Sequence, residues 1–129
     1  MSPVIYGVGT DLLRVSRMRL AYARRGERLP ERILHPAERG RYRAGESAPN
    51  FLAKCFAVKE ATVKALGTGF RGVGYNEVGW VQDERGKPEL VFSSRLASWM
   101  RTRGADGGHV SLSDEGDYVL AFVILLRAG

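Results

Sequence analysis

Two acidic side chains, Asp11 and Glu60, have the chemistry to share one divalent cation. Glu60 lies in a helix-like segment, "FLAKCFAVKEATVKALGTG", one turn before Lys64, and Asp11 follows the glycine-rich stretch "GVGT". Carboxylate oxygens are the ligands that Mg²⁺ prefers, and Mg²⁺ usually takes one or two of them and shares the rest of its shell with phosphates and water. If the fold brings the two acids together, they could hold Mg²⁺ against a phosphate.

Each of these residues also has a simpler interpretation. Glu60 and Lys64 could form only a surface ion pair at i, i+4, which is worth about 0.3–0.5 kcal/mol. Asp11 could cap the N-terminus of the next helix, although Thr10 or Ser16 could also do so. The residue pattern by itself leaves both interpretations open.

Lys59 stands where this helix should be apolar. At 100° per residue the apolar side chains form one broad arc. The arc consists of Phe51, Leu52, Cys55, Phe56, Val58, Val63 and Leu66. Lys59 falls in the middle of it, where a charge is costly unless the ammonium reaches solvent or finds a partner. A strip of alanines (53, 57 and 61) runs beside Glu60 and predicts that something bulky lies there.

The elements that must position these residues alternate along the chain. We expect a strand from Val4 to Leu13, a helix from Ser16 to Tyr22 or slightly beyond that closes at Gly26, short helices at Pro30–Leu34 and after Pro36, the central helix ending at Gly67 or Gly69, two strands around a turn at Glu84–Lys87, a helix at Arg95–Arg103, and a final hairpin that turns near Asp114–Asp117. The last strand is apolar enough to be central in its sheet. In the first strand, Gly7 and Gly9 would let another group approach the backbone closely. This order predicts one α+β domain over residues 1–129.

The net charge of +6 is concentrated in one segment. Between Arg14 and Arg43 ten arginines stand against three glutamates, a local balance of +7, while ten basic and eleven acidic residues elsewhere sum to −1. A one-sided basic field speeds encounter with an acidic partner and is screened by salt. Nucleic acid, a membrane surface, an acidic protein or a polyphosphate would fit, as would a solvated arginine-rich helix without a partner.

Composition narrows the class of protein. A single cysteine, Cys55, rules out a disulfide framework within the chain. No segment resembles a signal peptide or an apolar run long enough to span a membrane. We therefore expect a cytoplasmic protein without membrane insertion.

Four segments together resemble one enzyme family over essentially the whole chain. They are "GVGTDLLRVSRM", "FLAKCFAVKEATVKALGTG", "GKP" and "HVSLSDEGDYVLAFVIL", in that order. The chain is thereby similar to the holo-acyl-carrier-protein synthases, the 4'-phosphopantetheinyl transferases of bacterial fatty-acid synthesis. The resemblance implies the α+β fold of that family and a homotrimer with active sites between subunits. It also implies transfer of the phosphopantetheine arm of coenzyme A to a serine of acyl carrier protein, with Mg²⁺ required and adenosine 3',5'-bisphosphate released.

The resemblance also assigns the reacting groups. Asp11 and Glu60 match the two carboxylates that hold Mg²⁺ beside the coenzyme A pyrophosphate. Lys64 matches the lysine that neutralises or protonates the departing phosphate and contacts the cofactor. Glu60, or a metal-bound water under its influence, is the favoured base for the serine proton.

Further positions match residues that contact coenzyme A or the carrier. Lys59 is assigned to the phosphates or to orienting a neighbour, and His109 to the 3'-phosphate region. The expected cofactor contacts are Lys59, Lys64, Gly67, Thr68, Gly69 and His109. Arg17 matches a residue that docks the acidic carrier. The expected docking residues are Arg14, Arg17, Met18, Arg24 and Arg25.

Two positions, Cys55 and Asp114, depart from the family pattern, and one other function class is an alternative. Asp114 stands where many relatives have histidine, and we interpret it as part of the final turn. Cys55 stands where many relatives have an arginine that grips coenzyme A phosphate, so that contact is in doubt here. Its place on the apolar arc predicts a buried, unreactive thiol. The alternative is a small basic nucleic-acid-binding module, but aromatic side chains are not interleaved with the arginines as a base-stacking surface needs.

Overall fold

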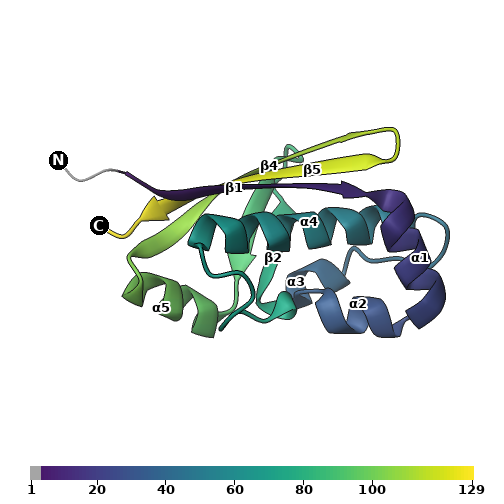
Figure 1. Ribbon diagram of the computed structural model, residues 1–129, viewed down its shortest axis with the longest axis horizontal. Coiled ribbons are helices and arrows are strands. Elements are labelled where there is room, and N and C mark those ends of the chain that lie inside the picture. The colour runs from purple at the N-terminus through teal and green to yellow at the C-terminus, as the bar shows by residue number, and fades with distance from the viewer. Residues whose placement is uncertain (1–3) are drawn as a thin grey trace.

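A three-stranded antiparallel sheet lies across one long helix, α4 (Ala48–Leu66), in the computed structural model, which describes residues 4–129 (Figure 1). The strands are β1 (Ile5–Arg14), β4 (Ala105–Glu115) and β5 (Tyr118–Arg127), in the order β1-β5-β4. The last strand is therefore central, as its apolar sequence predicts. Thirteen of the nineteen residues of α4 are buried, because the helix is enclosed on several sides.

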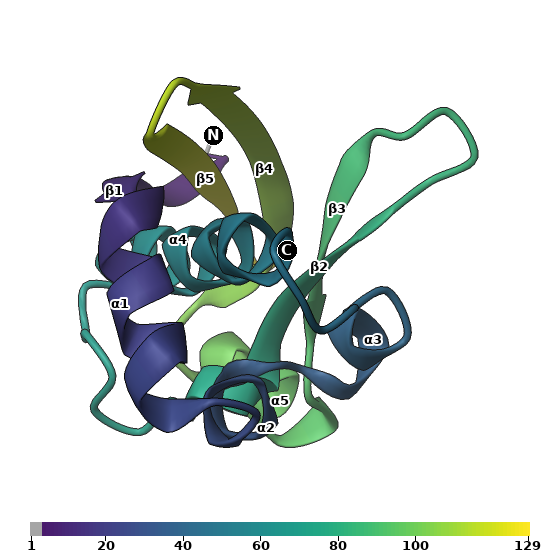
Figure 2. The same cartoon turned by 90° about the vertical axis from the view of Figure 1, so that its right-hand side faces the viewer.

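Most of the remaining elements lie at the ends of α4 and on its side away from this sheet, and a two-stranded hairpin extends up beside β4 (Figures 1 and 2). They are α1 (Val15–Arg25), α2 (Arg28–Ile33), α3 (Pro36–Arg39), the 3₁₀ turn η1 (Tyr75–Glu77), the hairpin β2 (Val78–Gln82) and β3 (Pro88–Phe92), and α5 (Ser94–Thr102). All the elements expected from the sequence are present, with ends that differ by a few residues. Among residues 4–129 no helix has the length and apolar character needed to cross a membrane.

The backbone of β1 packs directly on α4. A methyl group at Gly9 would overlap the carbonyl oxygen of Ala61, and one at Gly7 would overlap that of Ala65. The group that approaches the two glycines is thus α4, and the alanine strip of the helix receives the strand. This contact explains why both partners carry the smallest residues where they meet.

The sheet has one buried face and one exposed apolar face. Side chains alternate along a strand, so the core takes Val119, Ala121, Val123 and Leu125 of β5, all fully buried. The outer face carries large apolar side chains that remain exposed in the single chain. They are Val8 and Leu12 of β1 and Tyr118, Leu120 and Phe122 of β5. Such a continuous apolar patch is unusual on a free surface.

Two details of the strand ends differ from expectation. Strand β1 continues to Arg14, so Asp11 lies within the strand, opposite Ala121, and the N-cap interpretation of Asp11 is wrong. The start of α1 is instead bound by Asp117 of the final hairpin: its carboxylate accepts hydrogen bonds from the Ser16 N–H (2.9 Å) and hydroxyl (2.6 Å), and its carbonyl from the Val15 N–H (2.7 Å). The hairpin turn is also tighter than expected, because Asp114 is still paired with Val119.

The β1–α4 contact predicts a large difference between two glycine substitutions. Gly9→Ala should destabilise the protein by about 3 kcal/mol, since the added methyl group has no room and overpacking forces backbone shifts. Gly40→Ala is the matched control: Gly40 has helical backbone angles and open space at the Cβ position, so stability should change by less than about 1 kcal/mol. Urea unfolding measures both, and equal stability of the two variants would contradict the close approach.

Candidate functional site

Asp11, Glu60 and Lys64 meet at the junction of β1 and α4. Asp11 lies on the inner face of β1, because its neighbours Thr10 and Leu12 face outward. Lys64 Nζ lies 3.3 Å from the Asp11 carboxylate and donates a hydrogen bond to the Thr10 carbonyl oxygen at 2.9 Å. The ammonium of Lys64 therefore contacts a strand that is far away in sequence. The simple i, i+4 pair between Glu60 and Lys64 does not describe this arrangement.

The electrostatics of Glu60 show that Asp11 is a close neighbour. Burial raises the pKa of Glu60, the negative charge of Asp11 raises it further, and the ammonium of Lys64 opposes both. Two carboxylates and one ammonium thus share a partly buried corner with one net negative charge. This arrangement attracts a cation, because a cation between the two carboxylates would relieve their repulsion.

A pocket of about 610 Å³ opens beside these residues. Asp11 and Glu60 form one side of it. Helices α1 and α2 and the turn η1 form the other sides. Its lining residues beyond the two acids are Leu12, Leu13, Arg17, Met18, Ala21, Arg25, Leu29, Arg32, Ile33, Phe56 and Tyr75. The pocket thus combines a pair of acids, an apolar floor and three arginines.

The two acids have donor chemistry that fits Mg²⁺. Both present hard carboxylate oxygens to one pocket, and Mg²⁺ characteristically takes one or two such groups together with water and phosphate. Among residues 4–129 no group of three or more His, Cys, Asp or Glu side chains is arranged to hold a metal.

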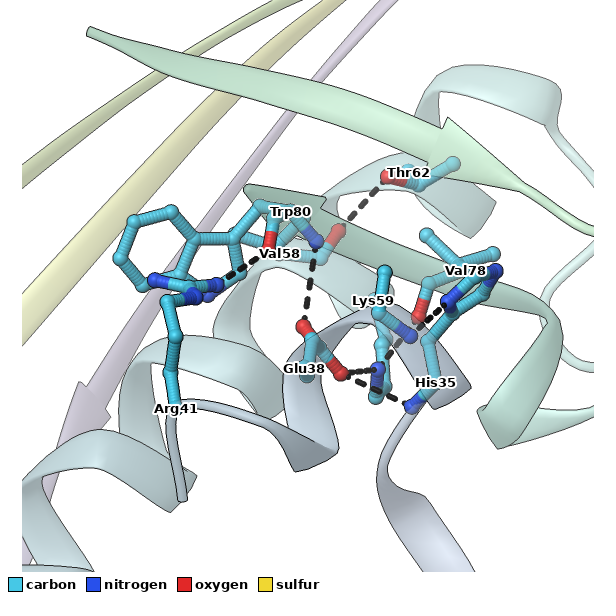
Figure 3. Close-up of polar contacts among 9 residues, drawn as sticks. His35, Glu38, Arg41, Val58, Lys59, Thr62, Val78 and Trp80 are labelled. Carbon is cyan, nitrogen blue, oxygen red and sulfur yellow. Dashed lines mark hydrogen bonds and ion pairs between the residues drawn. The ribbon is translucent and has the colours of Figure 1, made fainter. Parts of the chain in front are cut away.

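Lys59 does not belong to the ligand-contacting set, and that expectation is corrected. Its side chain is fully buried, and its ammonium pairs with the equally buried carboxylate of Glu38 at 2.8 Å (Figure 3). The ammonium also donates to the carbonyl oxygen of Val78. A phosphate cannot reach it. The sequence left two ways to accommodate a charge on the apolar arc of α4: the ammonium could reach solvent or find a partner. In the structure it finds a partner.

The glycine turn after α4 lies away from the pocket. Gly67 adopts a left-handed conformation (φ 80°) and its N–H closes the helix on the carbonyls of Val63 and Lys64. Thr68 donates its hydroxyl hydrogen to the carbonyl oxygen of Gly69. None of these three residues lines the pocket. Their assignment to coenzyme A stays a prediction, and their visible role is to end the helix.

His109 lies on the other face of the sheet from Asp11. It is exposed in β4 and pairs with Ile124, whereas its neighbour Val110 faces the core. Asp11 lies on the opposite edge strand, β1, with its side chain toward α4. A single chain thus keeps His109 apart from the two acids. His109 could meet such a site only in another copy of the chain.

The docking residues divide into three groups. Arg17, Met18 and Arg25 line the pocket, although Met18 is buried and contributes only to its floor. Arg14 stacks on the ring of Tyr118 at 5.3 Å, at the edge of the outer sheet face. Arg24 is exposed beside them. Of the four expected docking arginines, two, Arg17 and Arg25, therefore line the pocket that contains the acids.

Several residues of the site carry no signal in the sequence. Glu38 is the buried partner of Lys59; the preceding "HP" is compatible with a helix start, but nothing local predicts that the carboxylate turns inward. Arg32 and Tyr75 line the pocket from α2 and η1, elements whose approach to α4 depends on long-range packing. The ring of Tyr75 stacks on the ring of Phe56, with 5.8 Å between the ring centroids, and this contact positions Tyr75.

The segment that carries Tyr75 is held by an ion pair. Arg95 binds the carboxylate of Glu77 at 2.7 Å and donates to the carbonyl oxygen of Gly72 at 2.5 Å. The hydrogen bonds from Arg95, together with the Gly74 N–H and the Ser93 hydroxyl, lower the pKa of Glu77 to about 2. The η1 wall of the pocket is thus anchored to α5 by a carboxylate that stays ionised.

Cys55 is fully buried, as its helical position predicts. Burial raises the pKa of its thiol well above the ordinary value, so the thiol stays protonated. A protonated thiol in the core cannot replace an arginine at a phosphate.

The chain is similar over most of its length to proteins of known activity. Residues 7–123 match the family described as the 4'-phosphopantetheinyl transferase superfamily. A holo-[acyl-carrier-protein] synthase of Thiobacillus denitrificans is 51% identical over 95% of this chain and 94% of its own. One of Halorhodospira halophila is 45% identical over 95% and 98%, respectively.

Solved structures agree with these sequence matches. The crystal structure of holo-[acyl-carrier-protein] synthase from Neisseria meningitidis superposes with a TM-score of 0.87 at 41% identity, covering 94% of this chain and 98% of that one. A holo-(acyl-carrier-protein) synthase from Bacillus anthracis, in complex with CoA (3',5'-ADP), gives a TM-score of 0.78 at 29% identity, covering 98% and 100%.

Proposed function

The chain belongs to the 4'-phosphopantetheinyl transferase superfamily as an enzyme of the holo-[acyl-carrier-protein] synthase type, and we propose that it transfers the 4'-phosphopantetheine group of coenzyme A to a serine of an apo-acyl carrier protein. The reaction requires Mg²⁺ and releases adenosine 3',5'-bisphosphate. The observation that carries the proposal is that Asp11 and Glu60, distant in sequence, line one pocket with an arginine-rich mouth. We expect the protein to work in the cytoplasm, where coenzyme A and its carrier are available.

The residues of the pocket have separate roles in this reaction. Asp11 and Glu60 would hold Mg²⁺, which supplies electrophilic polarisation of the β-phosphate when bound. We assign the acceptance of the serine proton to Glu60, or to a water under its influence, because the pocket lining carries no histidine. The serine oxygen forms the new bond to the β-phosphorus, and the bond from that phosphorus to the bridging oxygen breaks.

Lys64 is suited to the departing phosphate. Its side chain is half exposed, so its ammonium can leave Asp11 without unburying a core group. The electron pair of the broken bond goes to the phosphate of adenosine 3',5'-bisphosphate. A compact ammonium beside that oxygen neutralises the charge or delivers the proton.

Transfer to a carrier is the direct test of this function. With apo-acyl carrier protein, coenzyme A and Mg²⁺, the carrier mass should increase by one phosphopantetheine group. Asp11→Asn and Glu60→Gln should lower the rate by more than about a hundredfold, because each removes a charge from the cation site. Both variants should remain folded by circular dichroism, since both side chains lie at the pocket surface.

Two outcomes would contradict the proposal. An unmodified carrier under all conditions would reject the transferase function and would agree with the basic nucleic-acid-binding alternative. Full activity of either variant would reject the metal assignment alone.

The basic mouth of the pocket supports docking of an acidic carrier. Arg17 and Arg25 of α1 and Arg32 of α2 border the pocket that holds Glu60, so a carrier bound there presents its serine to the acids. Charge complementarity of this kind raises the association rate and is weakened by salt.

Reversing one of these charges should act on binding. Arg17→Glu should raise the KM for the carrier about tenfold or more and flatten its salt dependence, with a smaller change in kcat. Arg103→Glu is the control, because Arg103 follows α5 and does not line the pocket; it should leave the KM for the carrier unchanged. Steady-state rates at several salt concentrations measure both, and a KM that Arg17→Glu leaves unaltered would rule out docking at α1.

We further propose a homotrimer that covers the outer sheet face. Leu12, Leu120 and Phe122 are between 39% and 64% exposed there, and a stable interface would bury them. The same face carries His109, so assembly could bring the histidine of one chain to the pocket of another. This arrangement is the one in which the coenzyme A assignment of His109 holds.

Sedimentation equilibrium tests this assembly. The wild-type protein should have the mass of three chains. Leu120→Glu should shift it to the monomer and reduce transfer, because a charge buried in the interface is not tolerated. A wild-type monomer that transfers at full rate would contradict a shared site.

A further inference from the structure

The buried ion pair between Lys59 and Glu38 links α4 to the chain segments that directly follow α2 and η1. Lys59 directly precedes Glu60 on α4, the helix that supplies Glu60 and Phe56 to the pocket. The opposite walls are α2 and η1. Figure 3 shows the pair between α4, α3 and β2, on the side of α4 away from the three-stranded sheet.

Glu38 connects this pair to the α2 wall. One carboxylate oxygen accepts from Lys59 Nζ and from the backbone N–H of His35 at 3.0 Å, and the other accepts from the N–H of Trp80 at 3.1 Å. His35 follows α2 by only one intervening residue, the buried Leu34. The carboxylate therefore fixes the end of α2, and so the pocket residues of that helix, relative to α4.

Lys59 connects the pair to the η1 wall. Its ammonium donates to the carbonyl oxygen of Val78, which directly follows η1 and begins β2. Tyr75 of η1 lines the pocket three residues earlier. The ammonium of Lys59 thus contacts both Glu38 of α3, which follows the α2 wall, and Val78, which follows the η1 wall.

The space around the pair is shaped to fit it. Gly79 has no side chain, and a methyl group there would collide with His35 and with the carboxylate of Glu38. The polar atoms of the pair are bound by three backbone groups from two segments: the N–H of His35 before α3, and the carbonyl of Val78 and the N–H of Trp80 in β2. An ion pair in a core is often no more stabilising than apolar side chains of equal volume. What apolar side chains cannot supply is direction, because only hydrogen bonds fix particular backbone atoms at particular distances.

We propose that the Lys59–Glu38 pair is a positioning element of the transferase, which sets the width of the pocket between α4 and the α2 and η1 walls and thereby the affinity for the acyl carrier protein. The inference rests on the proposed function. It assigns Lys59 a role through the pocket walls and no contact with coenzyme A. Glu38 is a positioning residue of the same kind, because its carboxylate touches no reacting atom.

The cation site should not depend on this pair. Asp11 is held against α4 by the glycine contacts of β1, on the other side of the helix from Glu38. Removing the pair should therefore change carrier binding and leave cation binding intact. If the pair only stabilised the fold, folded variants would bind both the carrier and the cation as the wild type does.

The test uses a double variant in the full chain. Glu38→Leu/Lys59→Met removes both charges together, which avoids leaving one buried charge without a partner. A second variant, Glu38→Gln, keeps the shape and loses the charge. Leu96→Ala is the control for destabilisation alone, since Leu96 is fully buried on α5 and does not line the pocket.

Two affinities are measured for each variant. One is the dissociation constant of fluorescently labelled apo-acyl carrier protein, which requires no turnover. The other is the dissociation constant of Mn²⁺, followed by electron paramagnetic resonance with coenzyme A present. The double variant and Glu38→Gln should bind the carrier about tenfold more weakly, because displaced walls lose contacts and orientation. Their Mn²⁺ affinity should stay within about twofold of wild type, and Leu96→Ala should change neither.

The outcomes separate the two proposals. Wild-type carrier affinity in either pair variant would overturn the positioning role, and so would an equal loss of carrier and Mn²⁺ affinity. If one pair variant fails to fold, the other decides. A wild-type chain that neither binds nor modifies the carrier would reject the proposed function first, whatever the pair variants do.

Discussion

The close packing of β1 on α4 is the contact on which the rest of the site depends. Because Gly7 and Gly9 have no side chains, the strand backbone lies directly on the helix at Ala61 and Ala65. This close packing brings Asp11 to the same pocket as Glu60 and lets the ammonium of Lys64 reach β1. Ordinary side chains between the two elements would separate the acids, and neither acid alone could bind a cation between negative phosphates.

The site is built with a surplus of negative charge that its ligands must balance. Burial and Asp11 raise the pKa of Glu60, and Lys64 offsets only part of the repulsion. Beyond the acids the balance changes sign, since three arginines border the same pocket. A cation between the acids and an acidic partner at the arginines would each meet the opposite charge. The two kinds of charge lie on different elements, so binding a partner at the arginines need not disturb the acids.

The two sides of α4 have different roles. Toward the sheet, the helix holds the acids through backbone contacts that need small residues. Toward α3 and β2, the helix is joined to both elements by one buried ion pair. The outer face of the sheet differs from both, because its large apolar side chains remain 39–64% exposed in the single chain. That face also carries His109, on the opposite side of the sheet from Asp11.

The sequence by itself determined the kinds and order of the elements, because hydrophobic periodicity and glycine positions are local properties. It also determined the candidate pair of acids and the arginine-rich segment, through residue types and the resemblance of four motifs. Tertiary structure decided which distant groups meet: Glu38 as the partner of Lys59, Asp117 as the group that binds the start of α1, and the separation of His109 from Asp11 by the sheet. Periodicity places a side chain on a face, but the partner it finds there depends on packing between segments far apart in the chain.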